Sequence, residues 1–305
     1  MKSKFNRSLS AAFIKTLEAE ALRGGWWADV LADPKLLIAV RDNCLNVYWR
    51  GQSMFRVTSV GGGFRVTTHE KYLVNPELAS QVPLKDRHFD ISSLVERGFI
   101  RSYVGPATIK KMKSASGLFT GIEKTGCHEI AVRNPTVIDC EIAFPGVDSP
   151  LDGVTANRLP RVDFASLETD DAGARLVFWE AKVFDNGDLR AQNGAPLVCT
   201  QVNTYMDYLF RHRQEIERSY TKVAANLVSL KGMGMKRQLS SLITDVASGK
   251  RRLTLGAEPK VGLIIFGYDS AQRDHAAWRD HLSNLTASIP QVIAVGDVKK
   301  VNLPK

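Results

Sequence analysis

The feature that most constrains the fold is the segment at residues 175–183, RLVFWEAKV. Side chains alternate between the two faces of a β-strand, so its even-numbered residues share one face and its odd-numbered residues share the other. The even-numbered face begins with Leu176 and Phe178, and the odd-numbered face is apolar from residue 177 onward. A strand with two apolar faces is covered on both sides. The segment therefore predicts a central strand of an α/β sheet.

Two charged residues, Glu180 and Lys182, end the even-numbered face of this strand. Burying even part of a charge is costly unless the charge is paired or binds a metal. One explanation is a Glu–Lys pair at a strand end, partly in water. A functional site is the other explanation, and Asp163 in the preceding strand-like run, RVDFASLE, favours it. Pairing of the two strands would bring the carboxylate of Asp163 beside that of Glu180.

Two carboxylates in one pocket repel each other, and a divalent cation relieves that repulsion. We expect Mg²⁺, with Mn²⁺ as a substitute, because it prefers carboxylate, carbonyl and water oxygens. Its expected ligands are Asp163, Glu180 and the backbone carbonyl of Ala181. Lys182 is expected to orient the attacking water and to stabilise charge on a phosphate. The pattern indicates hydrolysis of a phosphodiester bond.

The rest of the chain predicts an order of elements around this strand. Short β-prone runs over residues 36–68 predict a β-meander with a glycine hairpin turn at residues 61–63. A helical stretch and three strand-like runs follow, up to residue 183. One long helix is predicted over residues 197–216, after Pro196, and a buried strand over residues 260–269. We expect a β-rich module of unknown role at residues 1–105 and an α/β domain at residues 106–305.

Asp163, followed by Glu180, Ala181 and Lys182 on the next strand, resembles the PD-(D/E)xK nuclease superfamily. The resemblance covers about residues 131–269 and implies a restriction-endonuclease-like core of helix, three strands, helix and strand. It also implies that the Asp and the ExK residues bind the metal and activate water. The sequence departs from the pattern at Pro160, which lies three positions before Asp163 instead of next to it.

Gln201 and Tyr205, in the predicted helix after the ExK strand, resemble the Gln-x-x-x-Tyr of the RecB-like branch of this superfamily. A spacing of four places both on one helical face. The resemblance implies that the pair positions the substrate or the catalytic lysine. The alternative explanation is that Gln201 is a polar residue without a function and that Tyr205 is a half-buried packing residue.

Members of the superfamily have an acidic residue on the first core helix, and Glu123 and Glu129 are the candidates for it here. Glu141 on the first strand is a further candidate. We expect it to face away from Ile138, Cys140, Ile142 and Phe144, so a solvated strand face explains it equally well.

An excess of basic residues, 41 against 32 acidic ones, gives a formal charge of +9 and favours nucleic acid as the partner. Much of this charge follows the predicted helix, for example at Lys236 and Arg237. The four cysteines form no CxxC pair and the six histidines form no HxH or HxxxH pair, which argues against zinc sites and a disulfide framework. No apolar run approaches the roughly 20 residues of a membrane span, so we expect a cytoplasmic protein without a membrane partner.

Together these features predict a metal-dependent nuclease that acts on nucleic acid, with DNA favoured over RNA. Phage defence, repair and mobile-element biology are the settings considered. The N-terminal part is expected to serve recognition or assembly, including contact with a second copy or a partner protein. A non-catalytic nucleic-acid-binding or assembly protein with the same fold is the alternative from another class. A chance motif in an ordinary α/β protein is the third interpretation.

Overall fold

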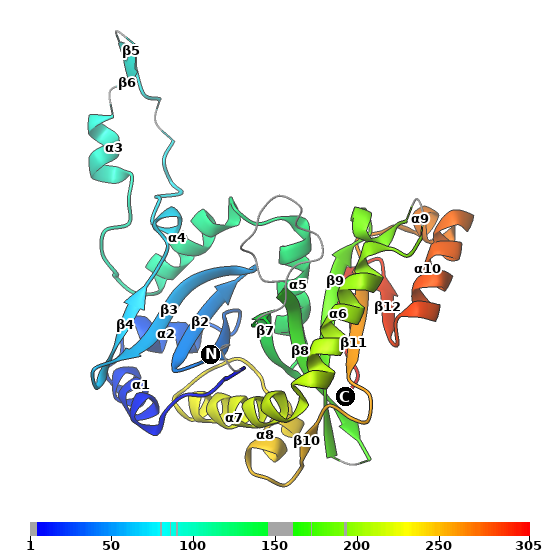
Figure 1. The fold of residues 1–305 in the computed structure, drawn as a ribbon. Helices are drawn as coiled ribbons and strands as arrows, with labels where there is room; N and C mark the ends of the chain where they lie inside the picture. Colours follow the sequence, from blue (N-terminus) through cyan, green and yellow to red (C-terminus); the bar gives the residue numbers. More distant parts are fainter. Residues whose placement is uncertain are drawn as a thin grey trace.

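The computed structural model describes residues 5–79, 81–85, 87–89, 91–145, 161–171, 173–191 and 194–305. Pro160 lies outside these residues. The fold is mixed α/β, with a four-stranded sheet near the N-terminus and a six-stranded sheet in the second part of the chain (Figure 1). Among the described residues, no helix combines the length and the apolar character needed to cross a membrane.

The N-terminal sheet is an antiparallel meander, as predicted. Its strands are β1 (Leu37–Arg41), β2 (Cys44–Trp49), β3 (Gln52–Val60) and β4 (Gly63–Thr67). Gly61 and Gly62 form the predicted turn between β3 and β4, with φ angles of 51° and 81° that favour glycine. Two helices, α1 (Ala11–Arg23) and α2 (Trp26–Ala32), precede the sheet. Ser10 caps α1 by accepting a hydrogen bond from the backbone N–H of Phe13 at 3.2 Å.

A segment with little regular structure connects the two parts of the chain. It contains η1 (Glu70–Tyr72), β5 (Leu84–Lys85), β6 (His88–Phe89), α3 (Ser92–Arg97) and α4 (Pro106–Gly117). The β5–β6 pair and α3 project away from the rest of the molecule in Figure 1. Helix α4 packs back against α2 and β3.

The larger sheet has the strand order β12-β11-β9-β8-β7, with β10 also paired to β9. Its strands are β7 (Val137–Ala143), β8 (Arg161–Asp170), β9 (Gly173–Val183), β10 (Leu253–Thr254), β11 (Lys260–Phe266) and β12 (Val292–Val295). Strands β7, β8 and β9 are antiparallel neighbours, whereas β11 runs parallel to β9 and to β12. The predicted central strand is confirmed, because β9 has strands on both sides and is buried on both faces.

The two faces of β9 contact different parts of the core. Leu176 and Phe178 belong to the larger hydrophobic cluster, together with Tyr205 and Tyr220. Val177 and Trp179 belong to a second cluster on the opposite face. This division follows the alternation predicted from the sequence.

Helix α5 (Ile122–Arg133) covers the face of the second cluster. Gly126 lies at its middle, and a Cβ atom there would come within 2.3 Å of the Phe266 ring on β11. The glycine therefore lets α5 approach the sheet closely, which outweighs its poor helix propensity. Close approach brings the first turn of α5 to the end of β9.

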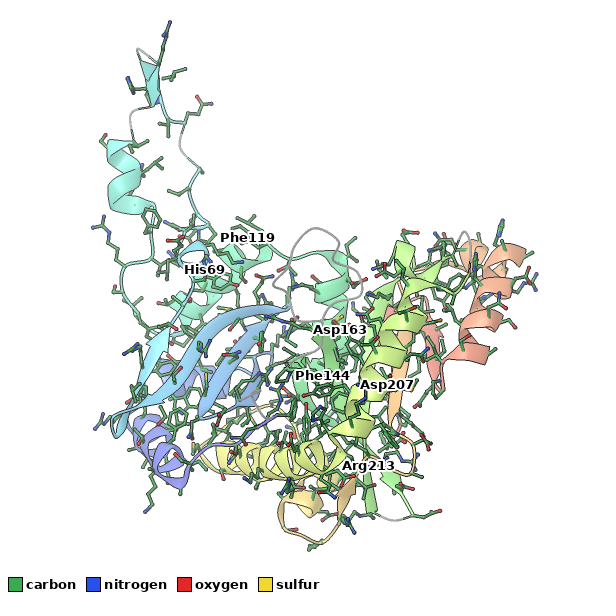
Figure 2. The ribbon with its side chains drawn as sticks, in the orientation of Figure 1. His69, Phe119, Phe144, Asp163, Asp207 and Arg213 are labelled. Atoms are coloured by element: carbon green, nitrogen blue, oxygen red, sulfur yellow. The ribbon has the colours of Figure 1, made fainter. Side chains whose placement is uncertain are left out.

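The predicted long helix after Pro196 is wrong in one respect, because it is two helices. Helix α6 (Leu197–Arg211) begins after Pro196 as expected, and α7 (Arg213–Gly232) begins after a break at His212. Figure 2 shows Arg213 at the corner between them. Its guanidinium donates to the backbone carbonyls of Gly256 and Ala257. These contacts hold the corner, and they come from a loop about 40 residues away that the helical pattern does not reveal.

The short helix η2 (Gly187–Leu189) lies between β9 and α6. The remaining helices follow α7 and are α8 (Ser241–Ala247), α9 (Ser270–Asp274), α10 (Ala276–Ser288) and η3 (Val298–Lys300). The strand predicted over residues 260–269 is confirmed as β11.

The hydrophobic core is continuous across the predicted domain boundary at residue 105. Phe5 packs against Phe144 and Tyr220, with ring centroids 6.0 and 5.9 Å apart. Leu9 donates its backbone N–H to Asn226 on α7 at 3.0 Å. The division into residues 1–105 and 106–305 stays a prediction, and the two parts share one core.

Candidate functional site

The site is built on the end of β9, beside the start of β8. Phe164 on β8 is paired with Trp179 on β9, so Asp163 stands next to this pair on the antiparallel strand. Its Oδ2 accepts a hydrogen bond from the backbone N–H of Ala181 at 2.8 Å. This bond fixes the Asp163 carboxylate against the strand that carries Glu180. Figure 2 shows Asp163 within the body of the molecule, beside α6.

Glu180 and Lys182 are both buried, with 3% and 6% of their surface exposed. The Lys182 ammonium contacts Glu180 Oε1 at 3.0 Å and Asp188 Oδ2 at 3.2 Å. Asp188, which the sequence analysis missed, belongs to the short helix η2 after β9. Asn186 caps this helix by accepting the Asp188 N–H at 2.9 Å. The turn-forming run Asp185-Asn186-Gly187-Asp188 was the available signal for a carboxylate folding back onto the strand.

Gln201 and Tyr205 lie on the buried face of α6, one turn apart. Gln201 Nε2 donates to the Tyr205 hydroxyl at 2.8 Å, and this hydroxyl donates to the carbonyl of Arg161 at 3.1 Å. Tyr205 is fully buried and Gln201 nearly so. The Tyr205 hydroxyl thus links α6 to the start of β8.

Helix α5 adds a further carboxylate at the edge of the site. Glu123 Oε2 accepts hydrogen bonds from the backbone N–H of Val183 at 3.2 Å and from Asn186 Nδ2 at 2.8 Å. Glu129, the other candidate on this helix, instead pairs with Arg133 on an exposed face at 3.6 Å. Glu123 is therefore the candidate that lies near the end of β9.

Glu141 lies on the opposite side of Asp163. It is half-buried, pairs with Arg161 at 3.6 Å and has a φ angle of 51°. A non-glycine residue in this region is uncommon and marks a locally constrained backbone. The expected alternation along β7 is wrong, because Cys140 joins a different hydrophobic cluster from Ile138, Ile142 and Phe144. The strand changes register between Val137 and Asp139, which a regular two-residue period cannot anticipate.

Burial and mutual repulsion disfavour the ionised forms of these carboxylates. Burial is the main cause that raises the pKa of Asp163 well above its usual range, and Glu180 and Glu141 add to it. Burial likewise raises the pKa of Glu180 to about 7, against the opposing effect of Lys182. Burial lowers the pKa of Lys182, but the neighbouring carboxylates outweigh it and the net shift is upward. Lys182 therefore stays protonated and charged, whereas burial favours the neutral, protonated forms of Asp163 and Glu180.

Two buried oxygens of this site have no partner among the described residues. Glu180 Oε2 is buried and accepts no hydrogen bond from any described residue, and the same is true of Gln201 Oε1. A buried acceptor without a partner is costly and calls for an explanation. Among the described residues, no group of three or more His, Cys, Asp or Glu side chains is arranged as a metal cluster. Mg²⁺, however, is commonly held by one or two carboxylates with water and phosphate oxygens.

We expect the metal-free protein to lose stability as the pH rises from about 5 to about 8. The unfolded chain releases the Glu180 proton near pH 4.5, whereas the folded protein keeps it until about pH 7. Between these two pH values the folded state binds more protons than the unfolded chain. The resulting stabilisation is fully present below about pH 4.5 and is lost as the pH rises through about 7. Asp163 acts in the same direction. The Glu180 contribution is about 2–3 kcal/mol.

Urea unfolding in the presence of a chelator measures this effect. Glu180→Gln keeps the shape of the side chain and cannot ionise, so the variant should lose less stability over the same pH interval than the wild type. Parallel pH profiles for the two proteins would contradict the assignment of a shifted carboxyl at Glu180.

The basic residues after α6 are less uniform than the sequence analysis expected. Arg237, predicted for a nucleic-acid-binding surface, is only 3% exposed and donates to the carbonyl of Val137 at 2.6 Å. That prediction is wrong for Arg237, because a buried guanidinium that bonds the backbone of β7 is structural. Lys236 is exposed. A local run of basic letters does not distinguish these two environments.

Comparison of the chain with models of protein families, with curated proteins and with solved structures gave no match.

Proposed function

We propose that the protein is a Mg²⁺-dependent nuclease with a PD-(D/E)xK, restriction-endonuclease-like core. The observation that carries the proposal is the convergence of Asp163, Glu180 and Lys182 from two adjacent strands into one buried site. The order α5, β7, β8, β9, α6 and β11 supports it, since it contains the helix, three strands, helix and strand of that core.

Asp163 and Glu180 would hold the cation, with the carbonyl of Ala181 as the further ligand. The unpartnered Glu180 Oε2 and the raised pKa values of both carboxyls fit such a role, because a cation would satisfy the oxygen and relieve the repulsion. When bound, Mg²⁺ supplies Lewis-acid stabilisation of phosphate charge and lowers the pKa of water.

The side chains around the carboxylates hold the geometry. The Ala181 N–H orients Asp163, and Glu180 and Asp188 hold the Lys182 ammonium between them. A fixed ammonium at this position stabilises the charge that gathers on a phosphate oxygen in the transition state. Gln201 and Tyr205 position the start of β8, the strand that carries Asp163. We assign Lys182 the catalytic role and treat Gln201 and Tyr205 as positioning residues.

Nucleic acid is the proposed substrate, with DNA favoured over RNA. The formal charge of +9 supports an anionic polymer as the partner, since basic side chains release counterions when they neutralise phosphates. Exposed cations remain near the corner of α6 and α7, where Arg211 and Arg218 border a cavity of about 380 Å³. A second copy or a partner protein on the N-terminal part stays an open proposal.

Cleavage of labelled single- and double-stranded DNA and RNA tests the proposal. We expect the wild type to cleave at least one of them with Mg²⁺ or Mn²⁺ and to lose the activity in a chelator. Asp163→Asn and Glu180→Gln should each abolish cleavage and weaken Mg²⁺ binding in calorimetry. The loss of affinity should at least match the about 10- to 100-fold typical for an outer-shell partner.

Glu129→Gln is the matched control, because Glu129 lies on α5 but pairs with Arg133 away from the site. It should cleave and bind metal like the wild type. Equal metal affinity in wild type and in the Asp163 and Glu180 variants would reject the metal site. Nucleic-acid binding without cleavage under every condition would favour the non-catalytic alternative.

A further inference from the structure

A second site lies next to the carboxylates, at the end of the sheet where β9 and β11 both finish. A cavity of about 410 Å³ opens there between the residues that follow β9 and the start of α10. Its lining residues are Phe184, Arg190, Ala271, Gln272, His275, Ala277, Trp278 and His281. Figure 1 shows α9 and α10 beside this end of the sheet. The carboxyl ends of parallel strands are a common place for ligand sites, and the volume is in the usual range for them.

The inner wall of the cavity is aromatic and carries one cation. The rings of Phe184 and Trp278 meet edge to face, with centroids 4.6 Å apart. The Arg190 guanidinium lies 4.7 Å from the Phe184 centroid and 5.7 Å from that of Trp278. Arg190 is held there because it donates to the carbonyl of Phe184 at 2.6 Å. Aromatic rings and guanidinium planes are the surfaces on which proteins stack unpaired bases.

Trp278 contributes its side chain to this wall, and its indole N–H is buried. Trp278 is 4% exposed, yet its Nε1–H has no partner among the described residues. A buried indole N–H usually finds an acceptor, so this side chain carries a polar group that the described residues leave unsatisfied. Ala277 and Trp278 also belong to the first turn of α10, which has no side-chain cap. The positive end of that helix favours a phosphate nearby.

The cavity lies close along the chain to the proposed catalytic site. Phe184 follows Lys182 by two positions, in the turn just after β9, so their Cα atoms are at most about 7 Å apart. Arg190 lies two residues after Asp188, which contacts Lys182. Adjacent nucleotides of a strand are spaced on the same scale, at about 3.4 Å in a duplex and more when extended. A base in the cavity would thus belong to a nucleotide close to the cleaved phosphate.

We propose that the cavity formed by Phe184, Arg190 and Trp278 holds one unpaired nucleobase of the strand that is cleaved at the neighbouring carboxylates. This inference rests on the proposed nuclease function and deepens it. A base inside a duplex is stacked and paired, so it must leave the helix before it enters such a cavity. The site therefore selects single strands, frayed ends and flipped nucleotides over continuous duplex.

Filling the cavity tests the proposal without disturbing the carboxylates. Ala277 lines the cavity and is exposed, so Ala277→Phe adds a ring there with little strain on the fold. Ala276→Phe is the matched control, because Ala276 is equally exposed on the same helix but is not part of the lining. Fluorescence anisotropy in a chelator, with labelled single-stranded DNA, single-stranded RNA and the matching duplex, reports binding in the absence of cleavage.

We expect Ala277→Phe to weaken binding of at least one single strand by about 5- to 100-fold, the usual effect of losing one stacked base. Ala276→Phe should leave that affinity unchanged, and duplex binding should be unchanged in both variants. An abasic nucleotide should weaken wild-type binding at one position of the strand and have no further effect on Ala277→Phe. Melting temperatures of the two variants confirm that both are folded, and Ala271→Phe replaces Ala277→Phe if the latter is not.

The outcomes separate this proposal from the nuclease proposal. Loss of single-strand binding in Ala277→Phe, with no cleavage by the wild type, supports the base site and rejects the nuclease. Cleavage by the wild type with equal single-strand affinities for Ala277→Phe and Ala276→Phe rejects the base site and leaves the nuclease standing. Absence of any single-strand binding by the wild type, or an equal loss of duplex binding in Ala277→Phe, also rejects the base site.

Discussion

Replacing Lys182 by methionine is expected to lower the rate of nucleic-acid cleavage by about 100- to 1000-fold, the usual effect of removing one group that stabilises transition-state charge. Methionine preserves most of the buried side-chain volume and removes the charge. Substrate binding in the ground state should change little, because many other cations contribute to it. Single-turnover cleavage at saturating Mg²⁺ measures the effect.

The pH of this assay matters, because Lys182 keeps the Glu180 carboxyl partly ionised. Without the ammonium, the pKa of Glu180 rises further above 7, and protons compete with the metal near neutral pH. The assay should therefore run at about pH 8–8.5, with metal affinity measured in parallel. Under these conditions a loss of rate reflects the missing charge and not an empty metal site.

Lys260→Met is the matched control for this experiment. Lys260 is also a strand residue of the same sheet, and it pairs with Glu168 at 3.0 Å. Its replacement removes an ion pair of the same sheet away from Asp163 and Glu180, although the Lys260 side chain is 33% exposed and that of Lys182 only 8%. If both variants cleaved at the wild-type rate and differed only in melting temperature, Lys182 would be a structural ion-pair partner.

Replacing Asp139 by asparagine is expected to lower the free energy of unfolding by about 3–5 kcal/mol, the usual cost of removing one partner from a buried ion pair. The Asp139 side chain is fully buried on β7. Arg41 contacts it at 2.7 Å and Arg7 at 3.4 Å, and the Tyr220 hydroxyl donates to it at 3.0 Å. Asparagine retains the shape but leaves two guanidinium groups without a counter-charge.

Asp207→Asn provides the control for Asp139→Asn. Asp207 pairs with Arg211 at 3.5 Å, and both side chains are 73% exposed. The free energy of this exposed pair is about 0–1 kcal/mol, because water and salt screen it. Urea unfolding at neutral pH compares the two variants. If Asp139→Asn and Asp207→Asn lowered the free energy of unfolding by similar amounts, the buried ion pairs of Asp139 would stabilise the fold no more than an exposed pair does.

The sequence predicted those elements whose pattern is local. The two apolar faces of residues 175–183 reflect neighbours on both sides of β9, and the glycines between β3 and β4 reflect a turn within the same hairpin. The grouping of Asp163, Glu180 and Lys182 was also predictable, because it depends on the pairing of two strands that follow each other.

Features that depend on distant segments were not predictable in this way. The break at His212 depends on a loop that Arg213 contacts about 40 residues later. The burial of Asp139 depends on Arg7 and Arg41 from the N-terminal part, about 100 residues or more away, and no local pattern indicates it. Phe184 and Trp278 lie almost 100 residues apart, so their cavity leaves no motif. In each case the environment of a side chain is determined by a segment that is distant in the sequence.

The shared core also has a consequence for the order of events during synthesis. The N-terminal meander leaves the ribosome first, but Arg7 and Arg41 lack their counter-charge until β7 has been made. The contacts of Phe5 form later still, because the Ser219 hydroxyl that donates to the Phe5 carbonyl lies 214 residues further along the chain. Contacts of such long range slow folding and leave apolar surface exposed in the meantime. The first hundred residues are therefore a nascent segment that depends on β7 to neutralise its buried cations and on α7 to complete its polar contacts.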